Sequence, residues 1–139
     1  MTGISTNADD VAARIQGKAD RLSAAVATSM RSALLAVEAE AVKNLSGSGS
    51  AAAYSYPVPA RTGNLKNDRV VSQPSAYLGI IAFLADYAWA VHSGIVTEFA
   101  GRGKTRKVQR PARPFADDAV KAAQPSNYIF DAVERVMAT

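Results

Sequence analysis

Residues 9–45 read DDVAARIQGKADRLSAAVATSMRSALLAVEAEAVKNL, without a proline and with a single glycine, Gly17. Apolar side chains recur along this run at steps of three and four residues, which places them on one face of an amphipathic helix. They are Val11, Ile15, Ala19, Leu22, Val26, Met30, Leu34, Val37, Ala41 and Leu45. The pattern therefore predicts one long helix over residues 7–45.

The ends of this helix are marked by different signals. Asn7 or Asp9 is the predicted N-cap, because short polar side chains accept hydrogen bonds from the amides of the first turn. The run NLSGSGS, residues 44–50, predicts the C-terminal end, because glycine follows helices readily. Roughly 36 residues at 1.5 Å each would span about 54 Å, so we expect part of the helix to project from the body or to pack against another subunit.

The pattern changes after the helix. Residues 46–60 are rich in Gly, Ser and Ala and predict a flexible connector, which Pro57 and Pro59 stiffen toward its end. Residues 69–86 are rich in β-branched and aromatic side chains and predict two strands of an antiparallel hairpin, with Pro74 at a turn or edge.

Shorter elements follow in the C-terminal half. Residues 87–94 are predicted to form a short helix ended by Gly94, and residues 95–99 a further strand. Pro114 can occupy the first turn of one helix, and Ser126 can cap the last one.

These elements predict one α+β domain over residues 1–139, with the long N-terminal helix and the C-terminal helices packed on a small antiparallel sheet. Residues 61–139 would hold the sheet, a basic loop and the C-terminal helices. The length suits one domain, and the 48% apolar content includes much alanine, which buries little surface. We therefore expect a thin core that a partner surface completes.

Composition argues against several classes of function. The chain has no cysteine and one histidine, so we expect no thiolate or multi-histidine metal site and no cofactor. It has no run of about 18 apolar residues and no visible signal peptide, so we expect neither a membrane partner nor export, but synthesis and assembly in a cytoplasm.

The positive net charge of +4 comes from one segment. Six of the 16 basic residues lie between Phe99 and Phe115, which leaves ten basic against 12 acidic residues elsewhere. These six are Arg102, Lys104, Arg106, Lys107, Arg110 and Arg113. A basic loop of this kind can contact nucleic-acid phosphates or an acidic protein surface, and composition leaves both interpretations open.

Three further features have simpler structural explanations. GRGKT, residues 101–105, resembles the end of a phosphate-binding loop, but Glu98 occupies the position where that motif needs its first glycine. His92 lacks an identified catalytic partner, since spacing does not show whether Asp86 or Glu98 reaches it. The acidic pair at residues 117–118 fits the first turn of a helix.

Four aromatic side chains are candidates for interfaces, where amphipathic rings are enriched. Core packing is favoured for Tyr87 and Trp89, and interface contact for Tyr54 and Tyr56.

Three motifs occur in order after the long helix: P-x-x-x-R-T-G-x-L-K at residues 57–66, D-Y-A-x-x-V at residues 86–91 and A-R-P-F at residues 112–115. This succession resembles the tail-completion, or head–tail joining, proteins of siphophages, which are small neck proteins. The likeness spans residues 11–137. The chain departs from the family pattern at His92, where Glu is usual, and at Ala116, where a larger apolar residue is common. The candidate structural or interface residues of the motifs are Arg61, Thr62, Gly63, Leu65, Tyr87, Arg113, Pro114 and Phe115.

The resemblance implies a structural virion protein, not an enzyme, that joins the head connector to the tail. It implies a homo-oligomeric ring around the DNA channel, sixfold to match a tail, with head-connector and tail proteins as further partners. In such a ring the basic loop would line the channel and contact duplex DNA, or dock on an acidic neighbour. The alternative is a small sequence-independent DNA-binding protein that acts through the basic loop, residues 102–113.

The motif residues also have physical roles. Thr62 and Gly63 can form a tight turn that delivers Leu65 to the core. Arg113 is held extended by the proline that follows it, and Phe115 is the expected anchor of the last helical region on the sheet.

Overall fold

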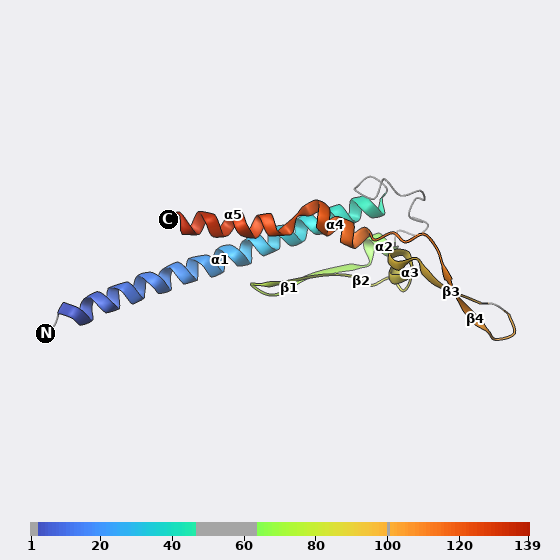
Figure 1. Ribbon diagram of the computed structural model, residues 1–139, viewed down its shortest axis with the longest axis horizontal. Coiled ribbons are helices and arrows are strands. Elements are labelled where there is room, and N and C mark those ends of the chain that lie inside the picture. The colour runs from blue at the N-terminus through green and yellow to red at the C-terminus, as the bar shows by residue number, and fades with distance from the viewer. Residues whose placement is uncertain (1–2, 47–63, 100) are drawn as a thin grey trace.

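The computed structural model describes residues 3–46, 64–99 and 101–139 of the chain. Residues 47–60 of the expected connector, and the candidate residues Arg61, Thr62 and Gly63, lie outside the described residues. The elements run in the order α1 (Gly3–Leu45), α2 (Asn64–Asn67), β1 (Arg69–Ser75), β2 (Leu78–Phe83), α3 (Ala88–Ser93), β3 (Ile95–Phe99), β4 (Thr105–Gln109), α4 (Phe115–Ala123) and α5 (Pro125–Met137). The α+β class predicted from the sequence is confirmed, and helices predominate (Figure 1).

Helix α1 ends at Leu45, as predicted, but begins at Gly3. Asn7 and Asp9 therefore lie inside the helix and do not cap it. The prediction relied on cap-forming side chains, yet no proline lies between Gly3 and Leu45 and Gly17 is tolerated in a helix interior. At 1.5 Å per residue the 43 residues span about 65 Å.

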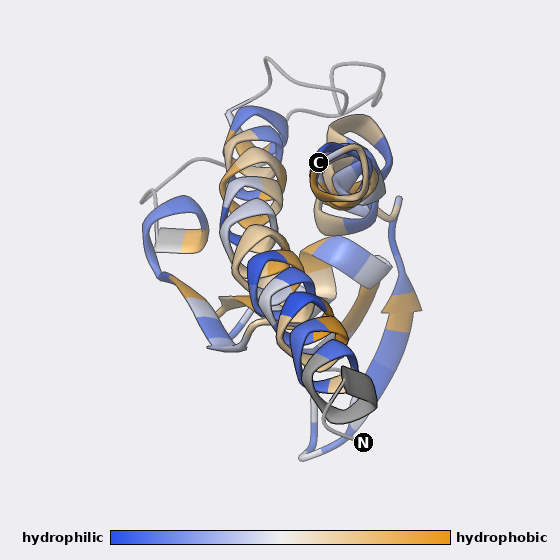
Figure 2. Cartoon of the chain, turned by 90° about the vertical axis from the view of Figure 1, so that its left-hand side faces the viewer, coloured by the Kyte–Doolittle hydropathy of each residue, from blue (hydrophilic) through white to orange (hydrophobic). Residues whose placement is uncertain are grey.

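The C-terminal helices return along α1. Figure 1 shows α5 running antiparallel beside α1, while the N-terminal end of α1 extends beyond the C-terminus of α5. Seen along the molecule, α1 and α5 stand side by side over the strands (Figure 2). Residues 7–17 are exposed at every position, whereas Val26, Ala33, Leu34 and Ala41 of the predicted apolar face are buried. The N-terminal part of α1 therefore projects from the body.

The best-buried cluster lies at the C-terminal end of α1. Leu45, Leu65 and Phe115 form its centre, and half-buried apolar side chains from β2 and α3 pack around them. The ring of Phe115 meets that of Phe83 edge-on, with centroids 4.9 Å apart. Beside it, the fully buried Asn44 donates a hydrogen bond of 2.9 Å from its Nδ2 to the carbonyl oxygen of Phe115. Leu65 and Phe115 thus join α2 and α4 to the end of α1.

The strands form two separate two-stranded antiparallel ladders, where the sequence had predicted a single small sheet. Strands β1 and β2 pair from Arg69 opposite Phe83, with an irregularity between Ser72 and Ser75 that contains Pro74. Proline lacks the amide that a regular ladder needs, which accounts for the irregular register there.

The second ladder corrects the prediction of a loop over residues 102–113. Residues 105–109 form strand β4, which pairs with β3. The charged side chains of TRKVQ obscured its strand character, although Val108 faces Val96 across the ladder.

Two joints between elements depend on left-handed backbone. Gly94 ends α3, as predicted, with φ 73°, and a Cβ at this position would clash with the carbonyl oxygen of Arg110. Gln124 joins α4 to α5 at φ 46°, and Pro125 is the first residue of α5. The prediction that Ser126 caps α5 is therefore wrong, because proline suits the first helical position and starts the helix earlier.

The buried bond of Asn44 generates a first prediction. Replacing Asn44 with Ala removes a hydrogen bond in a dry environment and leaves a small void, so we expect a loss of roughly 1–3 kcal/mol in the free energy of unfolding. Urea unfolding followed by circular dichroism measures the loss. Asn67→Ala is the matched control, because Asn67 is exposed at the end of α2. Equal midpoints for the two variants would contradict the role assigned to Asn44.

Candidate functional site: the basic hairpin

Strands β3 and β4 form a hairpin that projects from the body at the end opposite the N-terminus of α1 (Figure 1). Its base is fixed to the end of α3. The amide of Arg110 donates to the carbonyl oxygen of Gly94 at 2.6 Å, and Nε2 of Gln109 donates to the carbonyl oxygen of Ser93 at 3.3 Å. The hairpin, residues 95–110, is therefore tied to the helical body at its root.

One face of the hairpin has a local balance of charge. Glu98 lies opposite Arg106 in the ladder, and Nη2 of Arg106 is 3.3 Å from Oε2 of Glu98. Nη2 of Arg110 also pairs with Glu98, through Oε1. The hydrogen bonds from Arg110 and then from Arg106 hold the pKa of Glu98 below its ordinary value. This carboxylate, whose side chain is 26% exposed, therefore offsets the charge of these two arginines within the hairpin.

The other three cations of the hairpin lie outside this pairing. Arg102, Lys104 and Lys107 are exposed and make no ion pair within the described part of the chain. Gly101, Arg102 and Gly103 all have positive φ, at 81°, 49° and 72°. This tight turn presents Arg102 and Lys104 to solvent, whereas Lys107 is exposed within β4, opposite Thr97. We call these three side chains the tip cations.

The position of this turn also shows the structural setting of GRGKT, residues 101–105. A phosphate-binding loop of the expected type leads from a strand into a helix. Here the segment joins two strands of a hairpin, and β4 follows it. The basic segment is therefore an ordered hairpin without the structural context of that motif.

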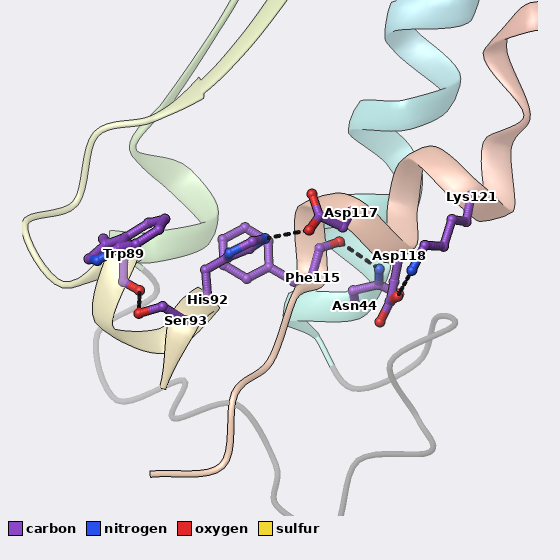
Figure 3. Close-up of polar contacts among 8 residues, drawn as sticks. All are labelled: Asn44, Trp89, His92, Ser93, Phe115, Asp117, Asp118 and Lys121. Carbon is purple, nitrogen blue, oxygen red and sulfur yellow. Dashed lines mark hydrogen bonds and ion pairs between the residues drawn. The ribbon is translucent and has the colours of Figure 1, made fainter. Parts of the chain in front are cut away.

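His92 packs between α3 and α4 near the root of the hairpin (Figure 3). Its ring stacks on Trp89 and meets Phe115 edge-on, with centroids 6.2 and 5.5 Å away. Nε2 of His92 is 3.6 Å from Oδ2 of Asp117, so the acid that reaches it is neither Asp86 nor Glu98. The nearby hydroxyl of Ser93 donates to the carbonyl oxygen of Trp89. These contacts attach α3 to the first turn of α4.

Trp89 differs from the sequence prediction. Core packing was expected for it and for Tyr87, yet both side chains are exposed, and Trp89 is among the most exposed apolar ones described. Helix α3 has only six residues, and its inner side is taken by Ala88 and Val91, which pack on the buried cluster. Trp89 therefore lies on the outer side of α3, with one ring face against His92.

The described residues of the three motifs meet at the root of the hairpin. The amide of Leu65 donates to the hydroxyl of Tyr87 at 3.1 Å, which joins the first motif to the second. The amide of Arg113 donates to the carbonyl oxygen of Val91 at 3.1 Å, which joins the second to the third. Pro114 precedes α4 as its N-cap residue, and Phe115 is buried beside them. The structure thus groups these residues at one junction, apart from the tip cations.

Glu98, the partner of the basic segment, was not predicted from the sequence. Glu98 lies just before Phe99, outside the acid-free window that begins after Phe99, and its pairing became visible only with the strand register. An acid in the apolar strand that precedes a basic turn is the signal that could have found it.

Other kinds of site have little support among the described residues. No group of three His, Cys, Asp or Glu side chains there could hold a metal ion. No helix in the same part of the chain combines the length and apolar character needed to cross a membrane. Comparisons of the chain with protein-family models, curated proteins and solved structures find no significant match.

The pairing of Glu98 generates a second prediction. We expect its carboxyl group to titrate below the ordinary glutamate range in an NMR experiment. Arg110→Gln together with Arg106→Gln should raise that pKa toward the ordinary value, because both stabilising donors are removed. Because folding lowers the pKa of Glu98, its ionised carboxylate stabilises the folded hairpin at pH values above the pKa of Glu98 in the unfolded chain. This stabilisation is lost as the pH falls through the pKa of Glu98 in the folded hairpin. Lys107→Gln is the control, and an unchanged pKa in the double variant would refute the pairing.

Proposed function

We propose that this chain is a structural protein of a tailed-phage neck, which joins the head connector to the tail as part of a homo-oligomeric ring around the DNA channel. The observation that carries the proposal is the meeting of the three motifs at one junction. Leu65, Tyr87 and Arg113 were singled out by resemblance alone, from segments far apart in the sequence, and hydrogen bonds join these segments. Motifs that serve one structural role are required to lie together in the fold, as these do.

The shape of the molecule supports a role in assembly. A projecting helix at one end and a projecting hairpin at the other offer contact surfaces to neighbours on two sides (Figure 1). The described apolar surface includes exposed side chains, among them Trp89 and Phe130, of a kind enriched at interfaces. The partners proposed are further copies of the chain, in sixfold symmetry to match a tail, and the head-connector and tail proteins. The protein acts in the virion through contacts and not through catalysis.

The hairpin gives this ring a means of contacting DNA. The tip cations can meet phosphates of a duplex in the channel, and such contacts carry no information about base sequence. Docking of the same cations on an acidic neighbour is the other use of the hairpin within the ring.

A second candidate function is supported by the same tip cations. A small sequence-independent DNA-binding protein would need exposed charge without internal ion pairs, and Arg102, Lys104 and Lys107 are exposed and make none with the residues that the structure describes. In that case DNA affinity would be the main activity and assembly incidental.

Mass and shape in solution test the neck proposal. We expect light scattering and negative-stain microscopy of the purified chain at moderate salt to reveal rings without DNA. A monomer that binds duplex DNA with steep salt dependence would favour the second candidate. A monomer under all conditions, even with head-connector and tail proteins of its phage, would refute the proposed ring.

Substitution of the cations tests the use of the hairpin. Changing Arg102, Lys104 and Lys107 together to Gln should lower the slope of log affinity for DNA against log salt by up to about 2.7, because about 0.9 is lost for each phosphate contact. Changing Arg106 and Arg110 is the control and should lower it less, since Glu98 already engages both. In the neck protein, ring formation should survive the triple change. Loss of rings with unchanged DNA affinity would instead assign the tip cations to subunit contact.

A further inference from the structure

An open apolar groove runs between α1, the β1–β2 hairpin and the C-terminal helices. It encloses about 480 Å³, within the range of occupied binding pockets. Its walls are mostly apolar and include Leu34 and Val37 of α1, Leu78 and Phe83 of β2, Val120 of α4 and Ile129 of α5. Removing an apolar surface of this extent from water, by covering it with another apolar surface, has a favourable free energy.

The groove is held in shape by contacts along the β1–β2 hairpin. Arg69 pairs with Glu38 at 2.7 Å, and Nε2 of Gln73 donates to the carbonyl oxygen of Ala27 at 2.9 Å. At Gly79 a Cβ would lie 2.6 Å from the side chain of Leu34, so the hairpin approaches α1 very closely there. These contacts fix the hairpin against α1, so the groove is formed before anything enters it.

The projecting part of α1 has an apolar face that none of the described elements covers. Val11 and Ile15, one turn apart, are 48% and 66% exposed. Leu22 and Val26 continue the same face, and Val26 is buried against the body. The face therefore leaves the core and continues past the end of α5 (Figure 1). We call the apolar face formed by Val11 and Ile15 the ridge.

The ridge cannot enter the groove of its own chain. Residues of α1 line the groove, and α1 is continuous from Gly3 to Leu45 without a proline that could fold it back. A second copy of the chain, however, has both surfaces. An amphipathic helix that places residues at i and i+4 into an apolar groove is a recurring mode of recognition.

We propose that the ridge of one copy docks in the groove of the next copy, in a head-to-tail contact. One contact then covers both surfaces, whereas pairing of two ridges would leave the groove open and a small apolar ligand would leave the ridge bare. Because the surfaces differ, each added copy presents a free ridge and a free groove, and the series closes into a ring when the rotation allows. The inference rests on the self-assembly within the proposed function and names its subunit contact.

Complementary variants of the full chain test this contact. Val11→Glu with Ile15→Glu removes the ridge, and Val120→Glu, at a position 47% exposed, places charge in the groove. Each variant should weaken self-association by roughly 100-fold or more, because a carboxylate would be buried in the contact. Leu35→Glu is the matched control, since Leu35 is 52% exposed on α1 outside both surfaces, and it should assemble as the unmodified chain does.

Mixing the ridge and groove variants gives the decisive measurement. Each partner retains the surface that the other lacks, so sedimentation should detect a 1:1 heterodimer and nothing larger. A mixture that stays monomeric, or a groove variant that assembles normally, would overturn the head-to-tail contact. Rings that survive both variants would refute this inference and leave the neck proposal intact, whereas an unmodified chain that never self-associates would count against both.

Cross-linking gives an independent test if the groove variant fails to fold. The chain has no cysteine, so Ile15→Cys and Val120→Cys can be made without background thiols. An equimolar mixture of the two should form a mixed disulfide dimer on mild oxidation. Cross-linking of the Ile15→Cys variant with itself, in place of the mixed dimer, would indicate pairing of two ridges and refute the proposal.

Discussion

The buried contact between Asn44 and Phe115 is the constraint on which the arrangement of the chain depends. A carboxamide in the last turn of α1 donates to the first carbonyl group of α4, and the ring beside that carbonyl packs against β2 and α3. A polar side chain that is fully buried must keep its hydrogen bonds, so the start of α4 has little freedom of position relative to the end of α1. From that point α4 and α5 return along α1, and α3 and the root of the basic hairpin are fixed at the same place.

Local pattern was sufficient for the elements whose signals were local. The apolar period of three and four predicted α1, the β-branched run predicted the β1–β2 hairpin, and Gly94 marked the end of α3 because only glycine adopts its backbone readily. The start of α1 was misplaced because several residues near the N-terminus can cap a helix, but none of them is required to end it. Strand β4 was missed because its stability comes from pairing with β3, which composition does not encode.

The candidate site shows the same division more sharply. The basic character of residues 102–110 was visible in the sequence. The division of these cations into those that pair with Glu98 and those that do not was not visible there. Glu98 pairs with Arg106 and Arg110, while Arg102, Lys104 and Lys107 make no ion pair among the described residues, so five similar residues have two different electrostatic situations. The grouping of Leu65, Tyr87 and Arg113 at one junction was likewise beyond sequence reasoning, because hydrogen bonds between distant segments bring it about.

The length of α1 has a mechanical consequence. The C-terminal part of α1 packs against α4, α5 and the β1–β2 hairpin, whereas residues 7–17 are exposed. The helix is therefore held at one end and free at the other. An unsupported arm of about 20 Å, tilted by about 10° at its held end, displaces its free end by roughly 3–4 Å. Small rotations in the packed body are thus amplified at the end of the arm. A molecule built in this way can reach neighbours at slightly different angles without repacking its core.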